Sequence, residues 1–306
     1  MDTHECIKGY KFWDARRLKP FSYFRGMQWK GVIPNFFTMA NLCCGTLAIV
    51  SLFTVPSFTP AALLILAAAV FDLFDGLLAR MLKVAGPLGK QLDSLADAVT
   101  FGIAPTIMVF ILLSRVLAQT GYPDQLKYVA LLLAIASIYR LGKFNIDSRQ
   151  GDKFLGLPTP ANALFWIAVG QLYFHSDPLF ITTHPALEET GWQALKLGSW
   201  DAHLLETRPA YLLWVFHPLT LIALIVGMSA WMVSEIPLLA LKFKDYGWHG
   251  NRSRYFFILG TIILLTICGI SAVSVFLAVP FILLLYLLIS LWNQHTTKKH
   301  EIPRRD

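Results

Sequence analysis

The sequence predicts an all-α, polytopic membrane helix bundle, and three observations support this fold class. First, 56% of the 306 residues are hydrophobic and 15% are charged, with a mean hydropathy of +0.55, which is too apolar for a soluble domain of this length. Second, apolar runs long enough to cross a bilayer recur along the chain. Third, the basic residues lie between these runs and form no RNA-binding stripe. The formal charge of +7 therefore suits anionic lipid heads and not nucleic acid.

Apolar runs of about 20 residues, the length needed to span a bilayer, give eight candidate helices. They cover residues 33–55, 60–82, 88–118, 125–145, 158–175, 210–233, 254–270 and 272–293. The boundaries of the last three are the least defined, because Gly269 to Ser274 forms a minimal turn and a re-entrant pair would give a similar pattern. Six or seven spans therefore remain open.

The chain divides into three segments. Residues 1–32 mix basic and aromatic side chains, which is typical of an interfacial amphipathic stretch, with a disordered basic tail as the alternative. Residues 33–245 form the expected transmembrane core, interrupted by a polar outer loop at about 175–208, and residues 246–306 form C-terminal transmembrane helices with a basic tail. The four cysteines show no paired spacing, so neither a disulfide framework nor a zinc site is indicated.

Positive charge alternates between the two sides of the bundle. Cytoplasmic loops accumulate Lys and Arg, and every second loop of this chain is basic, as are both ends. The opposite side keeps only Arg115, Lys127, Lys196 and Arg208. This asymmetry predicts an even number of spans, with both termini on the cytoplasmic side of a bacterial inner membrane.

Four acids lie inside two adjacent apolar runs: Asp72 and Asp75 in the second, Asp93 and Asp97 in the third. A spacing of three or four residues places each pair on one helix face, and the two pairs are expected at the same depth. Each Asp costs about 2.5–3.5 kcal/mol at the bilayer centre, so a cation is expected to compensate them. Carboxylates without nearby His or Cys select Mg²⁺, Mn²⁺ or Ca²⁺.

Two classes of function use such a site. Four carboxylates can balance two divalent ions, a count suited to phosphoryl chemistry. Intramembrane acids also serve proton relays and ion-coupled transporters, so the acids alone leave enzyme and transporter open.

The acids belong to a longer pattern, Asp75-Gly76-x2-Ala79-Arg80-x8-Gly89-x3-Asp93-x3-Asp97, with Asp72 three residues upstream. This pattern resembles the signature of the CDP-alcohol phosphotransferase family. The resemblance implies a six-helix core, here followed by about two C-terminal helices, and a homodimer. It also implies two metal ions, Mg²⁺ or Mn²⁺, on the four Asp residues and a CDP-linked donor on the cytoplasmic side. Asp93 and Asp97 would be catalytic, with Asp97 as general base, metal ligand or both.

Further stretches resemble the phosphatidylserine synthase branch of that family. They are residues 33–45, 93–105, 154–160 and 233–237. The resemblance implies transfer of the phosphatidyl group of CDP-diacylglycerol to the hydroxyl of L-serine, with glycerol 3-phosphate, inositol or choline as alternative acceptors. One position departs from the branch: Lys143 stands where the branch has a second Arg after Arg140. Lys supplies charge but not the planar, two-pronged contact of Arg.

Several other residues are candidates for substrate contact. Gly76 and Ala79 lack bulk, so a nucleotide could approach the helix backbone, and Arg80 could bind phosphate. The alternative for Arg80 and Lys83 is the usual basic end of a cytoplasmic helix. Residues that form a polar stripe on the first span either contact CDP or bond neighbouring helices; they are Asn35, Thr38 and Asn41. Two basic residues either bind the acceptor carboxylate or are ordinary loop charges; they are Arg140 and Lys143.

Overall fold

The computed structural model describes residues 29–84, 86–146, 154–176, 214–238, 247–270 and 278–301. This part of the chain is almost entirely helical, which confirms the predicted fold class. The α-helices are α1 (Trp29–Thr54), α2 (Thr59–Met81), α3 (Pro87–Asp97), α4 (Ala104–Thr120), α5 (Leu131–Ile146), α6 (Thr159–Ser176), α11 (Pro218–Val233), α12 (Trp248–Ile270) and α13 (Ala278–Glu301).

Each of the eight predicted ranges contains a helix. Four helical stretches of the described chain are long and apolar enough to cross a membrane: Gly31–Thr54, Thr59–Met81, Pro87–Thr120 and Asp124–Ile146. That the remaining helices also cross the bilayer stays a prediction. The interfacial segment up to residue 28, nearly all of the loop at 175–208, and most of the turn at 269–274 lie outside the described residues.

Two departures from regular α-helix occur inside the predicted spans. The third span continues from α3 into α4 through a π-helical turn, η3 (Ala98–Ile103). The fourth begins with a 3₁₀ segment, η4 (Asp124–Ala130). Hydrophobic periodicity cannot reveal either feature, because an i→i+5 or i→i+3 bond changes the register by only one residue. The π turn follows Asp97 directly, so it sets how the third span leaves the acidic region.

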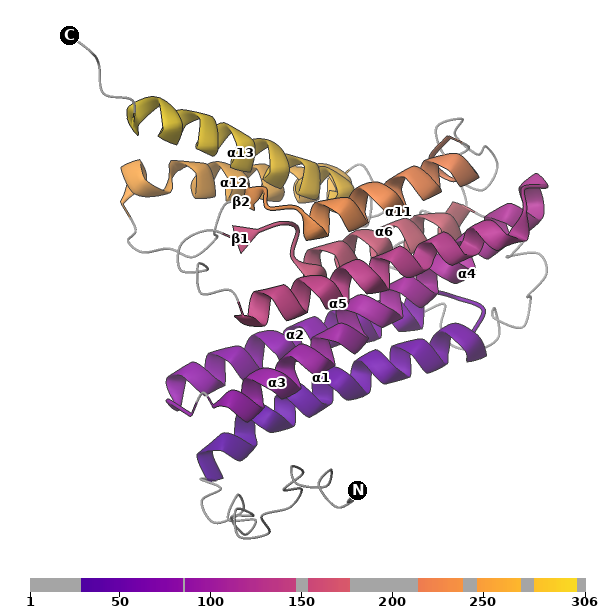
Figure 1. Cartoon of the computed structure of the whole chain (residues 1–306). Helices are drawn as coiled ribbons and strands as arrows, with labels where there is room; N and C mark the ends of the chain where they lie inside the picture. The colour runs from indigo at the N-terminus through magenta and orange to yellow at the C-terminus, as the bar shows by residue number, and fades with distance from the viewer. Residues whose placement is uncertain are drawn as a thin grey trace, which may run out of the picture.

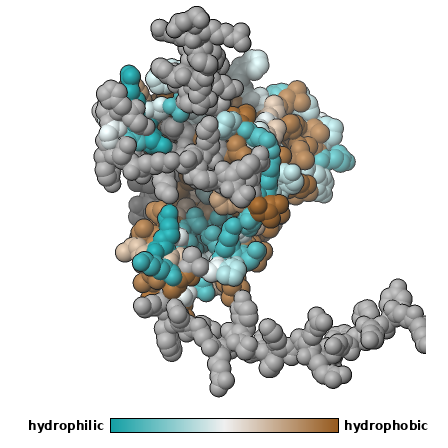
Figure 2. Space-filling view, turned by 60° about the vertical axis from the view of Figure 1, so that its left-hand side comes forward, coloured by the Kyte–Doolittle hydropathy of each residue, from teal (hydrophilic) through white to brown (hydrophobic). Residues whose placement is uncertain are grey.

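The helices form one elongated bundle with α1 and α2 on one side and the α12–α13 pair on the other (Figure 1). Helix α6 packs against α4, α13 and α2, and Trp166 and Ala168 on it are completely buried. A helix that is apolar and buried on nearly all sides forms the centre of a bundle. Seen from the end where α2 finishes and α3 begins, hydrophilic residues gather between hydrophobic flanks (Figure 2).

A short backbone pairing ties the start of α6 to the end of α11. Strand β1 (Phe154–Leu155) pairs antiparallel with β2 (Pro237–Leu238). Gly156 follows with φ +67°, and its N–H donates to the carbonyl of Ile236 at 3.0 Å. A Cβ at this position would lie 2.6 Å from the carbonyl oxygen of Met232. Glycine is therefore required by both the left-handed backbone and the close approach, and the loop after α11 is held in place.

Helix α1 approaches the π turn at Gly45. A Cβ on Gly45 would lie 2.2 Å from Oγ1 of Thr100 and 2.9 Å from its Cα. The Thr100 hydroxyl donates to the backbone carbonyl of Asn41 at 3.2 Å. The absence of a side chain at Gly45 thus lets α1 and η3 make backbone-level contact beside Asp97.

We expect Gly45→Ala to lower the thermal unfolding midpoint of the detergent-purified protein, because overpacking a close helix contact costs about 1–3 kcal/mol. Gly227→Ala is the matched control: it also lies inside a helix, and an added Cβ there meets nothing within 4 Å. That variant should be neutral or more stable, since Ala favours helix over Gly by up to about 1 kcal/mol. Equal midpoints for the two variants would contradict a tight α1–η3 contact.

Candidate active site

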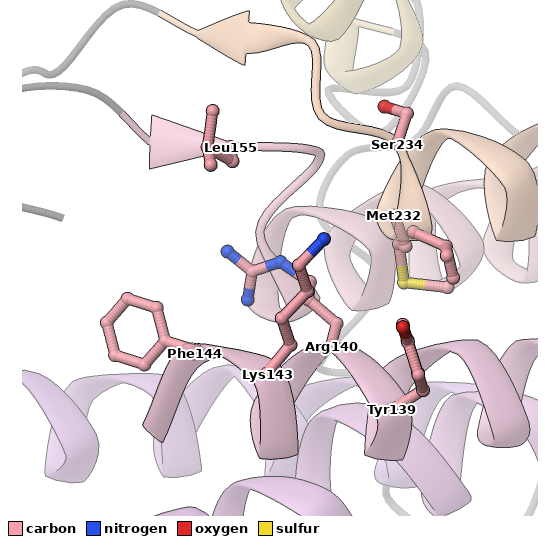
Figure 3. A pocket seen from close by; sticks show the side chains of 8 residues that line it. Tyr139, Arg140, Lys143, Phe144, Leu155, Met232 and Ser234 are labelled. Atoms are coloured by element: carbon pink, nitrogen blue, oxygen red, sulfur yellow. The ribbon is translucent and has the colours of Figure 1, made fainter. Parts of the chain in front are cut away.

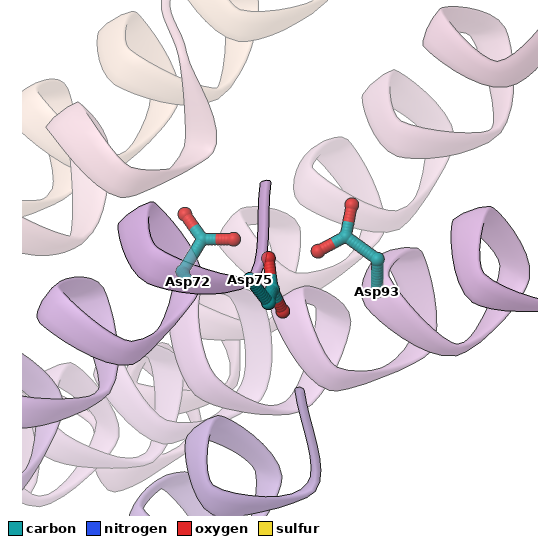
Figure 4. Close-up of side chains that lie close together, drawn as sticks. All are labelled: Asp72, Asp75 and Asp93. Atoms are coloured by element: carbon teal, nitrogen blue, oxygen red, sulfur yellow. The ribbon is translucent and has the colours of Figure 1, made fainter. Parts of the chain in front are cut away.

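Three aspartates from two helices converge at one point near the end of the bundle. Asp72 and Asp75 on α2 and Asp93 on α3 each place one carboxylate oxygen within 4.8 Å of the others, and Figure 4 shows the three side chains pointing toward one another. Asp97, one turn further along α3, interacts electrostatically with all three. The four acids of the sequence pattern are therefore neighbours in space.

A tight reversal between α2 and α3 produces this convergence. Helix α2 ends with Lys83 at φ 54°, and the N–H of Val84 donates to the carbonyl of Ala79 at 3.1 Å. This bond and the left-handed residue form the usual helix C-terminal motif, and α3 starts at Pro87, a residue favoured in the first turn. Since so few residues separate the helices, the two acidic faces meet at the same depth.

Helix α1 supplies hydrogen-bond donors to two of the acids. The hydroxyl of Thr38 donates to Oδ2 of Asp75 at 2.6 Å, and Nδ2 of Asn41 donates to Oδ1 of Asp97 at 3.1 Å. Asp75 is 3% exposed and Asn41 is fully buried. Of the two readings of the polar stripe, interhelical bonding is thus observed for Thr38 and Asn41, while contact with CDP stays a prediction. The third stripe residue, Asn35, lies beside Gly89 of α3.

No ion pair in the described part of the chain neutralises the charge of this cluster. The ion pairs found there, Lys127–Asp124 and Lys143–Glu235, involve none of the four acids. Oδ1 of Asp93 is buried without a hydrogen-bond partner. Grouped carboxylates in an apolar bundle are costly unless a counter-charge offsets them. An all-oxygen donor set with an unpartnered buried oxygen fits a hard divalent cation, which Asp72, Asp75 and Asp93 could hold.

The small and basic neighbours of the acids border open space. A Cβ on Gly76 would meet no atom within 4 Å. Arg80 is exposed, and its Nε donates to the carbonyl of Gly76 at 2.9 Å, so its side chain lies along the same helix face. Ala79 is half-buried beside it. The surface next to the acids can therefore admit a ligand close to the α2 backbone.

A hollow lies on the other side of α5 from α1 and α2. It encloses about 340 Å³ with open solvent at its mouth, and it is lined by Tyr139, Arg140, Lys143, Phe144, Leu155, Met232, Val233 and Ser234. The side chains of Arg140 and Lys143 rise from α5 into this hollow, below Leu155 and Ser234 (Figure 3). Nε of Arg140 is buried without a hydrogen-bond partner, and the guanidinium interacts electrostatically with Asp97. Arg140 is therefore the lining residue that connects the hollow electrostatically with the acidic cluster.

The structure adds residues that the sequence analysis did not select. Nζ of Lys143 lies 2.7 Å from Oε1 of Glu235, which follows α11. Tyr286 of α13 interacts electrostatically with Arg140, which lines the hollow. Nδ2 of Asn145 donates to the hydroxyl of Ser94, next to Asp93, at 2.7 Å. Glu235 lies in the stretch 233–237, which was noted for its resemblance, whereas no local pattern distinguishes Tyr286 from other tyrosines.

Comparison with known proteins places these features in a family. Residues 31–200, more than half of the chain, match the family model described as CDP-alcohol phosphatidyltransferase. All four aspartates fall within the match, and α11, α12 and α13 lie beyond it.

Three relatives carry the name CDP-diacylglycerol–serine O-phosphatidyltransferase. The chain is 38% identical to that of Bacillus subtilis over 141 residues, which is 46% of this chain and 76% of the relative. It is 33% identical to that of Mycobacterium tuberculosis over 147 residues, 45% of this chain and 48% of the relative. It is also 33% identical to that of Methanocaldococcus jannaschii over 141 residues, 46% of this chain and 61% of the relative. The matched stretch thus spans between half and three quarters of the relatives' length.

We expect Thr38→Val to destabilise the folded protein by about 1–3 kcal/mol, because the buried carboxylate of Asp75 loses its donor. Thr46→Val on the same helix is the control, since that hydroxyl is exposed and bonds only the carbonyl of Leu42 at 2.9 Å. Thr38→Ser should retain most of the stability. Thermal unfolding midpoints of the three variants measure the difference, and a Thr38→Val midpoint equal to that of Thr46→Val would show that the bond does not stabilise the site.

Proposed function

The chain belongs to the CDP-alcohol phosphatidyltransferase family, and from this premise we propose that it transfers the phosphatidyl group of CDP-diacylglycerol to the hydroxyl of L-serine. The products are phosphatidylserine and CMP. The observation that carries the proposal is the convergence of unpaired carboxylates from α2 and α3 inside an apolar bundle. The names of the relatives from three different organisms support serine as acceptor.

Members of this family depend on a divalent metal, and the acid cluster fits one. In our proposal Asp72, Asp75, Asp93 and Asp97 together hold two ions, Mg²⁺ or Mn²⁺. Bound there, the cations would neutralise the diphosphate of the donor and stabilise the departing phosphate oxygen. Thr38 and Asn41 fix the orientation of Asp75 and Asp97, so that the carboxylates are preorganised for this charge.

The donor would bind along the open face of α2. The empty space above Gly76 and the small side chain of Ala79 let the CDP diphosphate approach the helix backbone. Arg80 already lies on this face and can turn its guanidinium to a phosphate. The polar stripe of Asn35, Thr38 and Asn41 is the second wall of this proposed CDP site.

Asp97 is our proposed general base. Its carboxylate takes the proton of the serine hydroxyl as the hydroxyl oxygen attacks the phosphorus that carries diacylglycerol. The bond from that phosphorus to the bridging oxygen then breaks, and CMP leaves with the electron pair. A hydroxyl is a poor nucleophile at neutral pH, so a carboxylate in hydrogen-bond reach assists it, while positioning by the helix bundle supplies much of the remaining acceleration.

The hollow beside Asp97 is the proposed acceptor site. Arg140 and Lys143 place two cationic side chains in it, and the buried, unpartnered Nε of Arg140 suits an anionic ligand. The carboxylate of L-serine would bind these groups and bring its hydroxyl toward Asp97. Inositol and choline carry no anion to match them, which favours serine over these two alternatives.

The chain is an integral membrane protein, on the apolarity of its helices and its family. We further propose that it lies in a bacterial inner membrane with both termini and the active site on the cytoplasmic side, as the basic loops indicate. Residues 33–245 would form the catalytic core, with residues 246–306 as an added helical segment. A homodimer is part of the same proposal, on the basis of the family resemblance.

We expect purified protein with CDP-diacylglycerol, Mn²⁺ or Mg²⁺ and L-serine to release CMP. Separate reactions with glycerol 3-phosphate, inositol and choline identify the acceptor. CMP release with glycerol 3-phosphate and not with serine would reassign the acceptor. No CMP with any of the four alcohols would favour an ion transporter.

We expect Mn²⁺ to bind the purified protein, as measured by electron paramagnetic resonance of the free ion. Asp93→Asn should weaken binding by about 10-fold or more, because a ligand charge is removed. Asp124→Asn is the control: it also removes one acid, but Asp124 begins η4, pairs with Lys127 and is not part of the cluster. Equal binding by both variants would place the ion elsewhere.

We expect Asp97→Asn to lower kcat by about 100-fold or more, the usual contribution of a general base. If proton transfer is its main role, Mn²⁺ binding and the KM for CDP-diacylglycerol should change little. Parallel loss of Mn²⁺ binding would show that the main role of Asp97 is as a metal ligand and not as the base.

A further inference from the structure

The proposed acceptor hollow carries a negative charge at its edge as well as two positive ones inside. Lys143 lines the hollow, and its Nζ lies 2.7 Å from Oε1 of Glu235. Ser234, the residue before Glu235, also lines the hollow. The carboxylate therefore lies next to a site whose charged lining residues, within the part of the chain that the structure describes, are both cationic.

We propose that Glu235 determines acceptor specificity by binding the ammonium group of an amino-acid acceptor. This inference rests on the proposed function, since it names how the same hollow distinguishes serine from acceptors that have no positive charge. It assigns a role to a residue outside the stretch that matches the family model, which ends at residue 200.

The backbone at Glu235 is held in a defined position. The N–H of Ser234 donates to the carbonyl of Ala230 at 3.0 Å, and its hydroxyl donates to the carbonyl of Trp231 at 2.8 Å. On the other side of Glu235, Ile236 accepts a bond from Gly156 at 3.0 Å. Because both neighbours are anchored, the Glu235 side chain starts from a fixed point beside α5, as a specificity residue must.

The ion pair with Lys143 does not by itself account for this arrangement. The Lys143 and Glu235 side chains are 32% and 60% exposed, and a pair this accessible to water contributes little to the stability of a fold. Because most of the Glu235 side chain is open to water, an ammonium group from solution can reach its carboxylate. In this proposal the ion pair with Lys143 positions the Glu235 carboxylate, and the main effect of that carboxylate is to bind the ligand.

Charge complementarity then selects the ligand. An amino acid presents a carboxylate and an ammonium group on the same carbon, and the hollow presents Arg140 and Lys143 to the first and Glu235 to the second. Glycerol 3-phosphate would place anionic oxygens near Glu235 without any compensating cation, and this repulsion disfavours it.

The test compares three alcohols with full-length purified protein in CMP-release assays. L-serine carries both charged groups, L-glycerate lacks the ammonium, and serinol lacks the carboxylate. Glu235→Gln should raise the KM for L-serine about 10-fold, the usual effect of losing one charge-assisted hydrogen bond. Its kcat and its KM for CDP-diacylglycerol should stay near wild type, and glycerate should become relatively better, so that the serine-to-glycerate preference falls.

A second comparison distinguishes direct contact between Glu235 and the ligand from an indirect role in which Glu235 only positions Lys143. If Glu235 acts only by holding Lys143, then Glu235→Gln in a Lys143→Met background will leave the serine-to-glycerate preference unchanged, and the inference is overturned. If Glu235 contacts the ammonium, the preference will fall in that background too. An equal rise in KM for serine and glycerate in the single variant would also overturn it.

Different results would contradict the proposed function and the proposed role of Glu235. If the wild-type protein releases no CMP with serine, the proposed function itself is wrong. If the wild type uses serine and Glu235→Gln keeps the wild-type preference, only the role of Glu235 is wrong. Asp124→Asn, which removes the acid of the other described ion pair, should match the wild type in every assay.

Discussion

The structure depends on one electrostatic constraint: three carboxylates converge inside an apolar bundle, a fourth lies beside them, and no ion pair among the described residues neutralises any of the four. A cluster of this kind is tolerated only where the surrounding chain orients each acid and a counter-ion can offset the charge. The short α2–α3 reversal sets the distance between the pairs. Donors from α1 then fix Asp75 and Asp97. The site is therefore an outcome of how three helices pack.

The rest of the bundle keeps that geometry rigid. Gly45 allows α1 to reach the π turn after Asp97, and α6, buried nearly all round, fills the centre. On the opposite side, α5 carries Arg140 and Lys143, which line the hollow, and Arg140 also interacts electrostatically with Asp97. One helix thus links the proposed metal site to the proposed acceptor site.

The hollow is built from parts of the chain that are distant in sequence and that differ in their relation to the family. Arg140 and Lys143 lie within the matched residues, whereas Glu235 and Tyr286 lie beyond them. In our proposal the chemistry common to the family rests on α2 and α3, and the choice of acceptor rests on the residues around the hollow.

The sequence by itself determined the helices and the grouping of the acids, because apolar runs and three- or four-residue spacings are local properties that one helix expresses without any partner. Only the tertiary structure decided that Thr38 donates a hydrogen bond to Asp75, 37 positions away in the sequence, and that Lys143 pairs with Glu235, 92 positions away. It also revealed the π turn and the reach of Tyr286 to Arg140. These features depend on which helix faces which, and that choice follows from packing of the whole bundle and not from any short stretch of residues.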